Sequence, residues 1–454
     1  MNSKITIKEL SGIEGTLQAS KEFDITSLRS IGFGTKTIPC KFITKKQQDK
    51  TTIYISKNLL EELNIPANRT LHYFHDHDTL YVGPLVGIFT AGFTESLLRP
   101  IGERSLFFAK LLTMEKSVGV CAYVFGAHLI DWNEGTVNGY FYDEKEGWKQ
   151  QEVPLPSVIY DRLPNRRSER HHALKKIKQR LKDEYLIPWY NPGFFNKWEV
   201  FQLLSKDHEL STYLPETISA PTVADIKALL ERHKFVYIKP SNGSLGLGIF
   251  QVVASKDDSS FYCRYKDGEE NRLQRFYSLE KLIQYIFRNR SMQQYIVQQG
   301  IHLVRYENRP LDFRIHTNRD HNGKWQVTAI GAKVAGRGSV TTHLNSGGMV
   351  KTMEELFPDT SKRHDLQQQF DSTVLALSEA ISTNIDGFIG EIGFDIGLDR
   401  DGKLWLFEAN SKPGRAIFSH PKLRSQDKFT RELSMSYAIY LTHQDIYHPE
   451  VQYQ

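Results

Sequence analysis

The stretch that most constrains the fold of this chain runs from Glu391 to Gly414 and reads EIGFDIGLDRDGKLWLFEANSKPG. Asp401 and Gly402 stand between two runs of alternating apolar residues, a pattern that predicts a β-hairpin. A two-residue type I′ turn needs positive φ at both central positions, and Asp-Gly is a pair that supplies them. We therefore expect Arg400 to pair with Lys403, which sets the register of both strands.

That register decides which side chains of the hairpin share a face. Asp395 is expected directly opposite Glu408, and Gly393 directly opposite Asn410, because side chains alternate with a period of two. Asp395, Glu408 and Asn410 then lie on one face of the sheet. The other face is apolar and is expected to pack against the core; its members are Ile392, Phe394, Ile396, Trp405 and Phe407.

Two carboxylates that face each other across a hairpin destabilise it unless a cation lies between them. The oxygens of Asp395, Glu408 and Asn410 are hard ligands that suit Mg²⁺, which keeps some waters and takes further ligands from substrate phosphates. A solvated polar face without a metal explains the same three residues. If a metal is held, Asp395→Asn and Glu408→Gln should each abolish Mg²⁺-dependent turnover and leave the fold intact.

Length and composition describe an ordinary globular protein of two or three domains. The 454 residues exceed the size of one hydrophobic core, and a net charge of +5 is too small to indicate nucleic acid as a partner. Three scattered cysteines without a CxxC pair indicate a reducing compartment. The N-terminal residues lack the apolar core of a signal peptide, and no apolar run is long enough to span a bilayer. We expect a cytoplasmic protein that does not bind a membrane.

The first 185 residues predict two domains. Short β-type runs predict a β-rich N-terminal domain over residues 1–85, and alternating strands and helices predict a Rossmann-like domain over residues 86–185. In the first, the cluster of His72, His75 and His77 is a candidate metal site or, more simply, a polar turn. In the second, the basic run from Arg166 to Lys182 predicts a nucleic-acid contact or the solvated face of an amphipathic helix.

A loop rich in glycine follows the predicted strand FVYIK, which ends at Lys239. The loop reads PSNGSLGLG and contains Gly243, Gly246 and Gly248. Glycines let backbone N–H groups approach a phosphate closely, and a lysine adds a point charge. The loop is not a P-loop, because no GK[ST] follows. A structural β-turn explains it equally well.

Further cations lie on two later strands. The segment LDFRIHTN places Asp312 and Arg314 two residues apart, hence on one face, and Lys333 and Arg337 follow in QVTAIGAKVAGRG. Arginine forks bidentately to phosphate oxygens and lysine supplies compact charge, so the set suits a triphosphate. Each of these residues taken alone is explained as a surface cation.

In this order, the strand-end lysine with its glycine loop, the D-x-R strand and the D…E-x-N hairpin resemble the ATP-grasp superfamily. The closing FEANSKPG is similar to the E-x-N-x-x-PG ending of its glutamate-ligase and D-alanine-ligase branches. The whole chain resembles the endospore coat-associated proteins of the YheC/YheD type. The resemblance implies an α/β (α+β) fold with an ATP-grasp domain over residues 186–445, whose two subdomains hold the nucleotide between them.

The resemblance also implies which residues bind ATP. Lys197 and Lys239 match the two lysines that hold its phosphates, and Glu307 matches a residue that reaches the ribose. A mobile glycine loop covers the phosphates, and the backbone of the segment between the subdomains binds adenine. The residues of this chain at those two places are Gly243, Ser244, Gly246, Gly248, Gln298, Gln299, Gly300 and Ile301.

The expected catalytic residues are Arg314 and Arg337, which match cations near the γ-phosphate and the acyl phosphate. The three oxygen ligands of the hairpin match the ligands of Mg²⁺, for which Mn²⁺ is an alternative. Where the glutamate-ligase branch has an Asn four residues before a Gly-Gly pair, this chain has His343. The resemblance therefore leaves the acceptor side of the reaction undefined.

The activity that the resemblance implies is that of an ADP-forming carboxylate-amine ligase acting on an amino acid or a peptide. A carboxylate attacks the γ-phosphate of Mg-ATP, and an amine then displaces phosphate from the acyl phosphate, so no protein nucleophile is needed. Two alternatives stay open. One is an ATP-binding structural protein of the spore coat that binds coat proteins without turnover, and the other is a nucleic-acid-binding protein that uses the basic run.

Overall fold

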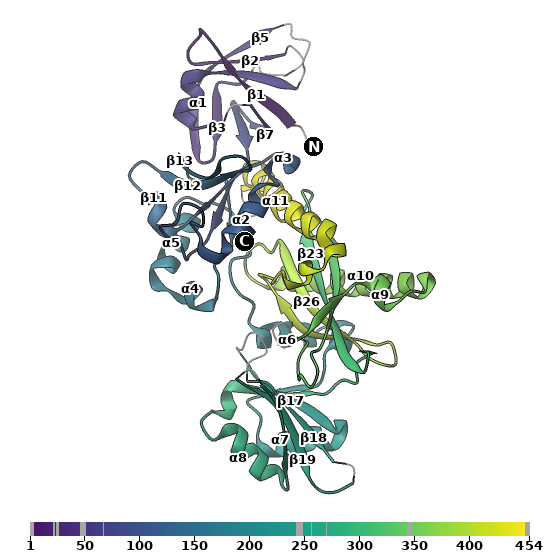
Figure 1. Ribbon diagram of the computed structural model, residues 1–454. Coiled ribbons are helices and arrows are strands. Elements are labelled where there is room, and N and C mark those ends of the chain that lie inside the picture. Colours follow the sequence, from purple (N-terminus) through teal and green to yellow (C-terminus); the bar gives the residue numbers. More distant parts are fainter. Residues whose placement is uncertain are drawn as a thin grey trace.

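The computed structural model describes residues 4–20, 23, 27–45, 51–66, 68–241, 248–255, 257–268, 270–342 and 347–449. Figure 1 shows the sheets of this described part arranged along an elongated molecule. The sheets of residues 4–83 and 85–190 occupy one end and the sheet of residues 217–299 the other, with the sheet of residues 305–410 between them. Helix α11 (Arg424–Tyr447) contacts strands of the first, second and fourth sheets and so ties them together.

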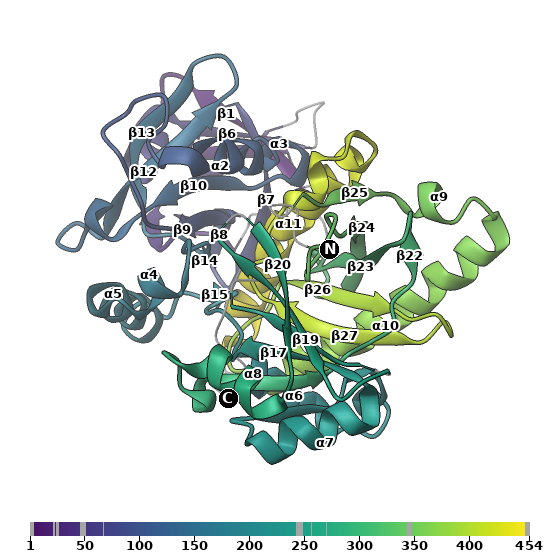
Figure 2. The same ribbon diagram turned by 60° about the horizontal axis from the view of Figure 1, so that its bottom comes forward.

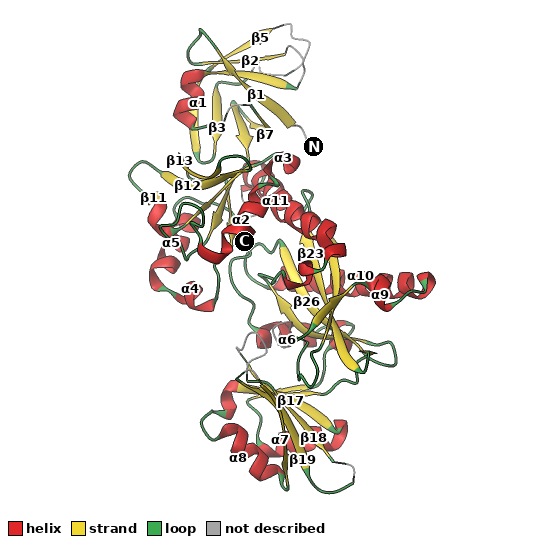
Figure 3. Ribbon diagram, in the orientation of Figure 1, coloured by secondary structure: helices red, strands yellow, loops and turns green. Residues whose placement is uncertain are grey.

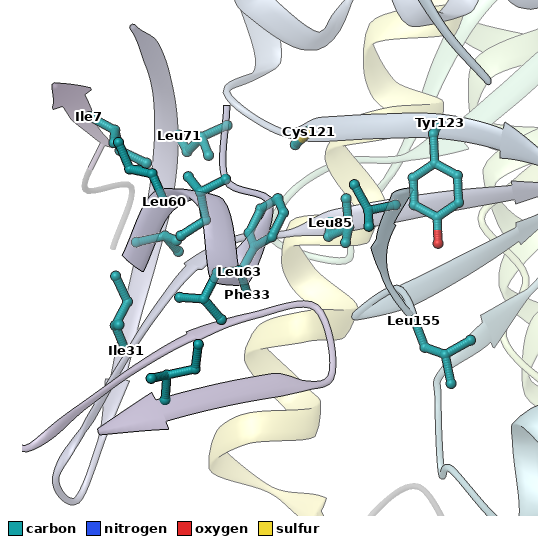
Figure 4. Packing of buried hydrophobic residues seen from close by; sticks show 14 of the residues in the cluster. Ile7, Ile31, Phe33, Leu60, Leu63, Leu71, Leu85, Cys121, Tyr123 and Leu155 are labelled. Atoms are coloured by element: carbon teal, nitrogen blue, oxygen red, sulfur yellow. The ribbon is translucent and has the colours of Figure 1, made fainter. Parts of the chain in front are cut away.

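The first sheet consists of eight strands in the order β4-β3-β8-β7-β1-β6-β2-β5, and Figure 3 shows that strands dominate this end of the molecule. Its core continues into the second sheet, because Phe33 and Leu63 belong to the same buried cluster as Leu85 and Tyr123 (Figure 4). The two sheets therefore share one hydrophobic core. The elements are β1 (Lys4–Leu10), β2 (Thr16–Ser20), β3 (Ser30–Phe33), β4 (Lys36–Pro39), β5 (Lys41–Lys45), β6 (Thr52–Ser56), α1 (Lys57–Leu63), β7 (Arg69–Asp76) and β8 (Thr79–Gly83).

The second sheet has the order β11-β12-β10-β9-β14-β15, and β13 pairs with β12. Strands β10, β9, β14 and β15 run parallel, and β9, β10 and β14 are buried along their whole length. Continuous apolar strands of this kind are typical of a parallel sheet covered on both faces. The elements are β9 (Leu85–Phe89), α2 (Ser105–Leu112), α3 (Glu115–Val118), β10 (Cys121–Phe125), β11 (Ile130–Asp131), β12 (Thr136–Asp143), β13 (Gly147–Pro154), β14 (Val158–Asp161), α4 (Arg166–Arg170), α5 (His172–Asp183) and β15 (Trp189–Tyr190).

The third sheet is antiparallel, with the order β16-β21-β17-β18-β19-β20. Helices α7 and α8 contribute Leu229 and Leu282 to the cluster that buries Val236 and Val252 of the sheet. A capping box between Thr222 and Asp225 starts α7. The elements are α6 (Lys197–Ser205), β16 (Thr217–Ser219), α7 (Val223–His233), β17 (Phe235–Pro240), β18 (Phe250–Ala254), β19 (Phe261–Asp267), β20 (Glu270–Phe276), α8 (Leu279–Phe287) and β21 (Tyr295–Gln299).

The fourth sheet is also antiparallel, with the order β25-β24-β23-β26-β27, and β22 pairs with β23. Its two faces differ sharply along β23, where Phe313 and Ile315 join the apolar cluster under α10 while Asp312 and Arg314 point to the other side. The elements are β22 (Arg305–Tyr306), β23 (Arg309–Arg319), β24 (Trp325–Val334), β25 (Met349–Lys351), α9 (Met353–Leu356), α10 (Thr360–Asn384), β26 (Glu391–Leu398) and β27 (Leu404–Asn410).

The hairpin of β26 and β27 has a three-residue loop in place of the expected two-residue turn. The N–H of Asp399 donates to the carbonyl of Lys403 at 3.0 Å, and Gly402 supplies the one positive φ of the loop, 86°. A bulge between Asp395 and Ile396 then shifts the register back by one residue. The two departures cancel, so Asp395 lies opposite Glu408 and Gly393 opposite Asn410, as expected.

The bulge also changes which residues of β27 reach the core. Leu404 and Leu406 are buried in the apolar cluster, so the expectation that Trp405 and Phe407 pack there is wrong. A Cβ placed on Gly397 would lie 2.6 Å from the ring of Phe407. Phe407 therefore lies on the same face as Asp395, together with Glu408.

The histidines of the first sheet are dispersed. His72 is buried in β7 and its Nε2 lies 3.0 Å from the carbonyl oxygen of Val118, whereas His75 is exposed and His77 lies in the turn that follows. Within the described residues, no group of three or more His, Cys, Asp or Glu side chains is placed to hold a metal ion. None of the helices in that part of the chain is both long and apolar enough to cross a membrane.

Candidate functional site

A small cavity of about 40 Å³ lies between the third sheet and the hairpin of the fourth. Helix α6 lies beside β27 of the fourth sheet (Figure 2), and residues of α6 and β27 line the cavity together with residues of β17 and β21 of the third sheet. The apolar walls of the cavity lead to a few charged groups, as the walls of ligand-binding pockets commonly do. The lining side chains are Lys197, Trp198, Val200, Phe201, Leu204, Leu214, Thr217, Lys239, Ser241, Ile296, Gln298, Leu406, Phe407, Glu408 and Ala409.

Lys239 at the end of β17 and Gln298 of β21 meet inside this cavity. Lys239 Nζ donates to Gln298 Oε1 at 2.8 Å, and Gln298 Nε2 donates to Thr217 Oγ1 at 2.9 Å. Among the described residues, no carboxylate forms an ion pair with this ammonium. Burial, and then the charge of Lys197, lower the pKa of Lys239 to about 8. A polyanion beside Lys239 would offset both effects.

Lys197 and Glu408 face each other at the same end of the cavity. Asn196 caps α6 by accepting the N–H of Trp198 at 3.0 Å, which places Lys197 in the first turn. Lys197 Nζ lies 3.3 Å from Glu408 Oε2, and both side chains keep about a quarter of their surface or less exposed. Ion pairs with partial solvent access contribute little stability, so Glu408 can exchange this lysine for another cation at small cost.

Beyond Glu408 lies a network of two carboxylates and two cations, formed by Asp312, Arg314, Lys333 and Asp395. Asp395 accepts from Arg314 through both oxygens, at 2.8 and 3.1 Å, and from Lys333 Nζ at 2.8 Å. Lys333 Nζ also lies 3.2 Å from Asp312 Oδ1. Burial would raise the pKa of Asp395, but Arg314 and Lys333 outweigh it and hold the pKa well below its usual range. Asp395 is therefore ionised.

The hairpin residues expected to hold a metal share one face and offer the right chemistry. Asp395 and Glu408 are directly paired, and Asn410 follows two residues later, opposite Gly393. Two carboxylates and an amide oxygen suit a hard divalent cation. Both oxygens of Asp395 already bond cations of the protein, so these three residues would hold Mg²⁺ only together with ligands from phosphates and water.

The structure describes only part of the glycine loop. Gly243, Ser244 and Gly246 lie outside the described residues, as does His343. Gly248 is described and has a φ of 72°, with Pro240 and Tyr295 nearest to the place of a Cβ. The loop thus rejoins the described chain beside the end of β17, near Lys239.

The segment expected to bind adenine is largely bonded within the protein. The N–H of Gln299 donates to Glu216 at 2.8 Å, and the N–H of Gly300 donates to Phe235 at 3.0 Å. The carbonyl of Ile301 accepts from the N–H of Leu303 at 3.0 Å. Of the four expected residues in this segment, the structure brings the side chain of Gln298 into the cavity.

Glu307 and Arg337 are among the expected residues that do not line the cavity. Glu307 lies in the turn between β22 and β23, where its exposed carboxylate pairs with Arg309 at 2.8 Å. Arg337 follows β24 and is exposed, and its carbonyl accepts from the side chain of Asn271 at 3.4 Å. Of the two expected catalytic arginines, Arg314 is the one that lies beside Asp395.

Sequence reasoning missed Thr217, Thr342 and Phe407. Thr342 Oγ1 donates to Asp312 Oδ2 at 2.6 Å, and Thr217 supports Gln298 from a neighbouring strand. No motif marks either threonine, because each contact joins segments far apart in the chain. Phe407 was assigned to the wrong face because a bulge leaves no clear signal in an alternating apolar run.

Comparison with known proteins identifies the family. A sequence model of YheC/D-like ATP-grasp proteins matches residues 186–441. The chain is 44% identical over 439 residues to endospore coat-associated protein YheD of Bacillus subtilis (strain 168), covering 96% of each chain. It is 24% identical over 279 residues to endospore coat-associated protein YheC of the same organism, covering 61% of this chain and 75% of YheC.

Among solved structures, the chain is similar to the VanG D-Ala:D-Ser ligase from Enterococcus faecalis, with 13% identity and a TM-score of 0.47 over 79% of this chain and 99% of that one. The match to the family model confirms the ATP-grasp fold that the order of the motifs predicted. The identity to YheD extends the likeness beyond the ATP-grasp region to nearly the whole length. The chain belongs to the YheC/D-like ATP-grasp family.

Proposed function

We propose that this protein is an ATP-dependent carboxylate-amine ligase that releases ADP and acts on an amino acid or a peptide. The observation that carries the proposal is a cavity whose apolar walls end at Lys197, Lys239 and Glu408. Membership in an ATP-grasp family supports the same reading. Arg314 and Lys333, which are buried beside Asp395, would supply further positive charge to a transferred phosphoryl group.

The apolar and the charged lining residues of the cavity favour one orientation of ATP, with its base among the former and its phosphates beside the latter. Val200, Ile296 and Phe407 supply apolar surface for a planar base. Lys197 and Lys239 lie at the charged end, where they would neutralise phosphates. Binding of a polyanion there would raise the pKa of Lys239 again, since opposite charge favours the ammonium form.

Asp395, Glu408 and Asn410 would hold Mg²⁺, or Mn²⁺ in its place, against the phosphates. The metal would supply charge neutralisation between phosphate oxygens. The protein prepares this by keeping Asp395 ionised and by leaving Glu408 only loosely paired with Lys197.

In the proposed reaction, an oxygen of the substrate carboxylate attacks the γ-phosphorus of ATP. The bond from that phosphorus to the bridging oxygen breaks, so ADP leaves and an acyl phosphate forms. The amine then attacks the acyl carbon, phosphate leaves, and the amine proton passes to phosphate or water. Arg314, which donates two hydrogen bonds to Asp395, would stabilise the charge on the transferred phosphoryl group.

A second candidate function is an ATP-binding structural role in the spore coat, in the company of coat proteins and without turnover. The observation that favours it is the name of the relative that is 44% identical over nearly the whole length, an endospore coat-associated protein. In either function we expect the protein to be made in the cytoplasm and not to bind a membrane.

The test is ADP release measured over a panel of amino acids and peptides, with binding of Mg-ATP measured in parallel. Glu408→Gln should weaken Mg-ATP binding by about 10- to 100-fold, the usual cost of altering a metal site. Glu280→Gln, an exposed glutamate on α8, is the matched control and should bind normally. Tight Mg-ATP binding without stimulated turnover by any compound would favour the structural role instead.

A further inference from the structure

A second group of buried charges lies at the edge of the second sheet that faces the fourth. Strand β9 lies between β10 and β14, and all three are parallel, so the strand order reverses at β9. In open sheets of this kind, ligands bind outside the carboxyl ends of the strands at such a reversal. Thr90 follows β9 and Arg162 follows β14, so both mark that edge.

Arg104 forms hydrogen bonds to the residues that follow both strands. Its Nη1 donates to Thr90 Oγ1 at 2.7 Å, and its Nη2 donates to the carbonyl of Arg162. Both acceptors are neutral, and no carboxylate of the described chain forms an ion pair with Arg104. Burial, and then the charge of Arg162, lower the pKa of Arg104 to about 10. The guanidinium is thus partly desolvated without a counterion in contact.

Arg162 has one carboxylate partner and one donor left over. Its Nη1 pairs with Glu391, which also accepts the hydroxyl of Tyr160 at 2.6 Å and that of Ser434 at 3.3 Å. Arg162 Nε is buried and has no hydrogen-bond partner within the described residues. Buried donors are normally satisfied, so this one points to a partner that the protein itself does not provide.

Two more arginines approach from the segment after the hairpin and from α11. Arg415 Nε donates to Asp427 Oδ1 at 3.0 Å, and Arg431 pairs with the same carboxylate. Burial and the charge of a neighbouring arginine lower the pKa of both to about 10, although Glu391 works against this for Arg415. The members of this arginine group are Arg104, Arg162, Arg415 and Arg431.

The charges of the arginine group do not balance. Its four guanidiniums share two carboxylates, Glu391 and Asp427, which leaves two positive charges without an acidic partner in the described part of the chain. The nearby Asp161 cannot serve, because it already pairs with Lys178 and Lys412. Retaining unpaired buried charge is costly unless a ligand compensates it.

His316 connects the arginine group to the network around Asp395. It lies two residues after Arg314 in β23, hence on the same face, and it is 1% exposed. Its Nε2 has no hydrogen-bond partner within the described residues. Burial, then Arg314 and Arg415, hold the pKa of His316 well below its usual range, so the ring is neutral. His316 thus adds a second unpartnered buried nitrogen, on the face of the fourth sheet that carries Arg314.

We propose that the arginine group binds a second carboxylate of the same substrate whose reacting carboxylate lies beside Arg314. The inference rests on the proposed function and deepens it, because it assigns the substrate to the dicarboxylic acids, among them the acidic amino acids. A carboxylate pairs bidentately with a guanidinium and accepts further hydrogen bonds from neighbouring donors. One such group would use the unpartnered Nε of Arg162 and neutralise charge at Arg104.

The test uses calorimetric titration of succinate, glutarate and adipate against butyrate, into the full chain loaded with Mg²⁺ and a non-hydrolysable ATP analogue. At least one dicarboxylate should bind about tenfold or more tightly than butyrate, the effect of one charge-assisted contact. Arg104→Gln should remove this preference and Arg104→Lys should restore part of it. Arg99→Gln, an exposed arginine in the preceding loop, should leave it unchanged. Unfolding midpoints of all variants verify that each is folded.

Equal binding of dicarboxylates and butyrate would overturn the inference, and so would a preference that survives in Arg104→Gln. The titration and the ADP-release assay together separate this inference from the ligase proposal. If a dicarboxylate is preferred but no compound stimulates ADP release, the ligase proposal fails and the anion site stands. If monocarboxylates stimulate ADP release and no dicarboxylate is preferred, the ligase proposal stands and the anion site fails.

Discussion

The network around Asp395 and the arginine group lie on either side of His316, and both are buried, yet their charges are arranged differently. In the network, Asp312 and Asp395 balance Arg314 and Lys333, and the cations bond carboxylates. In the arginine group, four guanidiniums share two carboxylates. The protein thus neutralises the cations of the network with its own carboxylates, whereas the arginine group keeps a surplus of positive charge that a ligand would neutralise.

The largest expected effect tests whether the balanced network is needed for folding. Asp395→Asn would leave Arg314 and Lys333 buried with one carboxylate fewer, which typically costs about 3 to 5 kcal/mol. We therefore expect a large fall in the free energy of unfolding, measured in urea, and not the intact fold that the sequence suggested. Asp401→Asn, in the exposed loop of the same hairpin, is the matched control and should change stability little.

The pH dependence of that variant sharpens the test. The pKa of Asp395 is lower in the folded than in the unfolded state, where an aspartate has a pKa of about 4. Its contribution is present above that pH and is lost as the pH falls below it. The gap between wild type and Asp395→Asn should therefore narrow from pH 5 toward pH 2. A gap that stays constant would show that the lost stability comes from shape and not from charge.

The next largest effect concerns Lys239, which resembles Arg104 of the arginine group because its hydrogen-bond partner among the described residues is neutral. With a pKa of about 8, Lys239 loses its charge between pH 7 and pH 9 in the free protein. Affinity for Mg-ATP should fall by about tenfold over that range, which corresponds to one pKa unit. Lys239→Arg stays charged and should flatten the profile. Identical profiles for the two proteins would mean that another group controls binding.

Much of the site could be predicted from the sequence because strands alternate with a period of two. This rule placed Asp312 with Arg314, and Asp395 opposite Glu408, on one face of the fourth sheet. The predicted pairing of Asp395 with Glu408 is correct, but the predicted two-residue turn is not. The loop is one residue longer, and the bulge after Asp395 compensates for the extra residue. The prediction for Phe407 is wrong for the same reason, because the bulge places this side chain in the cavity and not in the core.

What the sequence could not predict are the contacts set by docking of one sheet on another. Arg162 and Glu391 are 229 residues apart, and no sequence pattern connects the two. Lys333 and Arg337 look alike in the sequence, but Lys333 lies within β24 and points at Asp395 whereas Arg337 lies beyond the strand and is exposed. The two residues differ because β24 ends between them, and the end of a strand is difficult to predict from the sequence.

The smallest expected effect tests whether a hydrogen bond from a neutral side chain stabilises the network in addition to its ion pairs. Thr342→Val removes the hydroxyl that donates to Asp312 Oδ2, so a buried carboxylate oxygen loses its neutral partner while Lys333 remains. One such hydrogen bond contributes about 1 kcal/mol, so the free energy of unfolding should fall by that amount. Thr341→Val, the adjacent residue, controls for the change of side chain. If both variants lose the same stability, the contact with Asp312 contributes nothing specific, and the network is held by its two carboxylates and two cations alone.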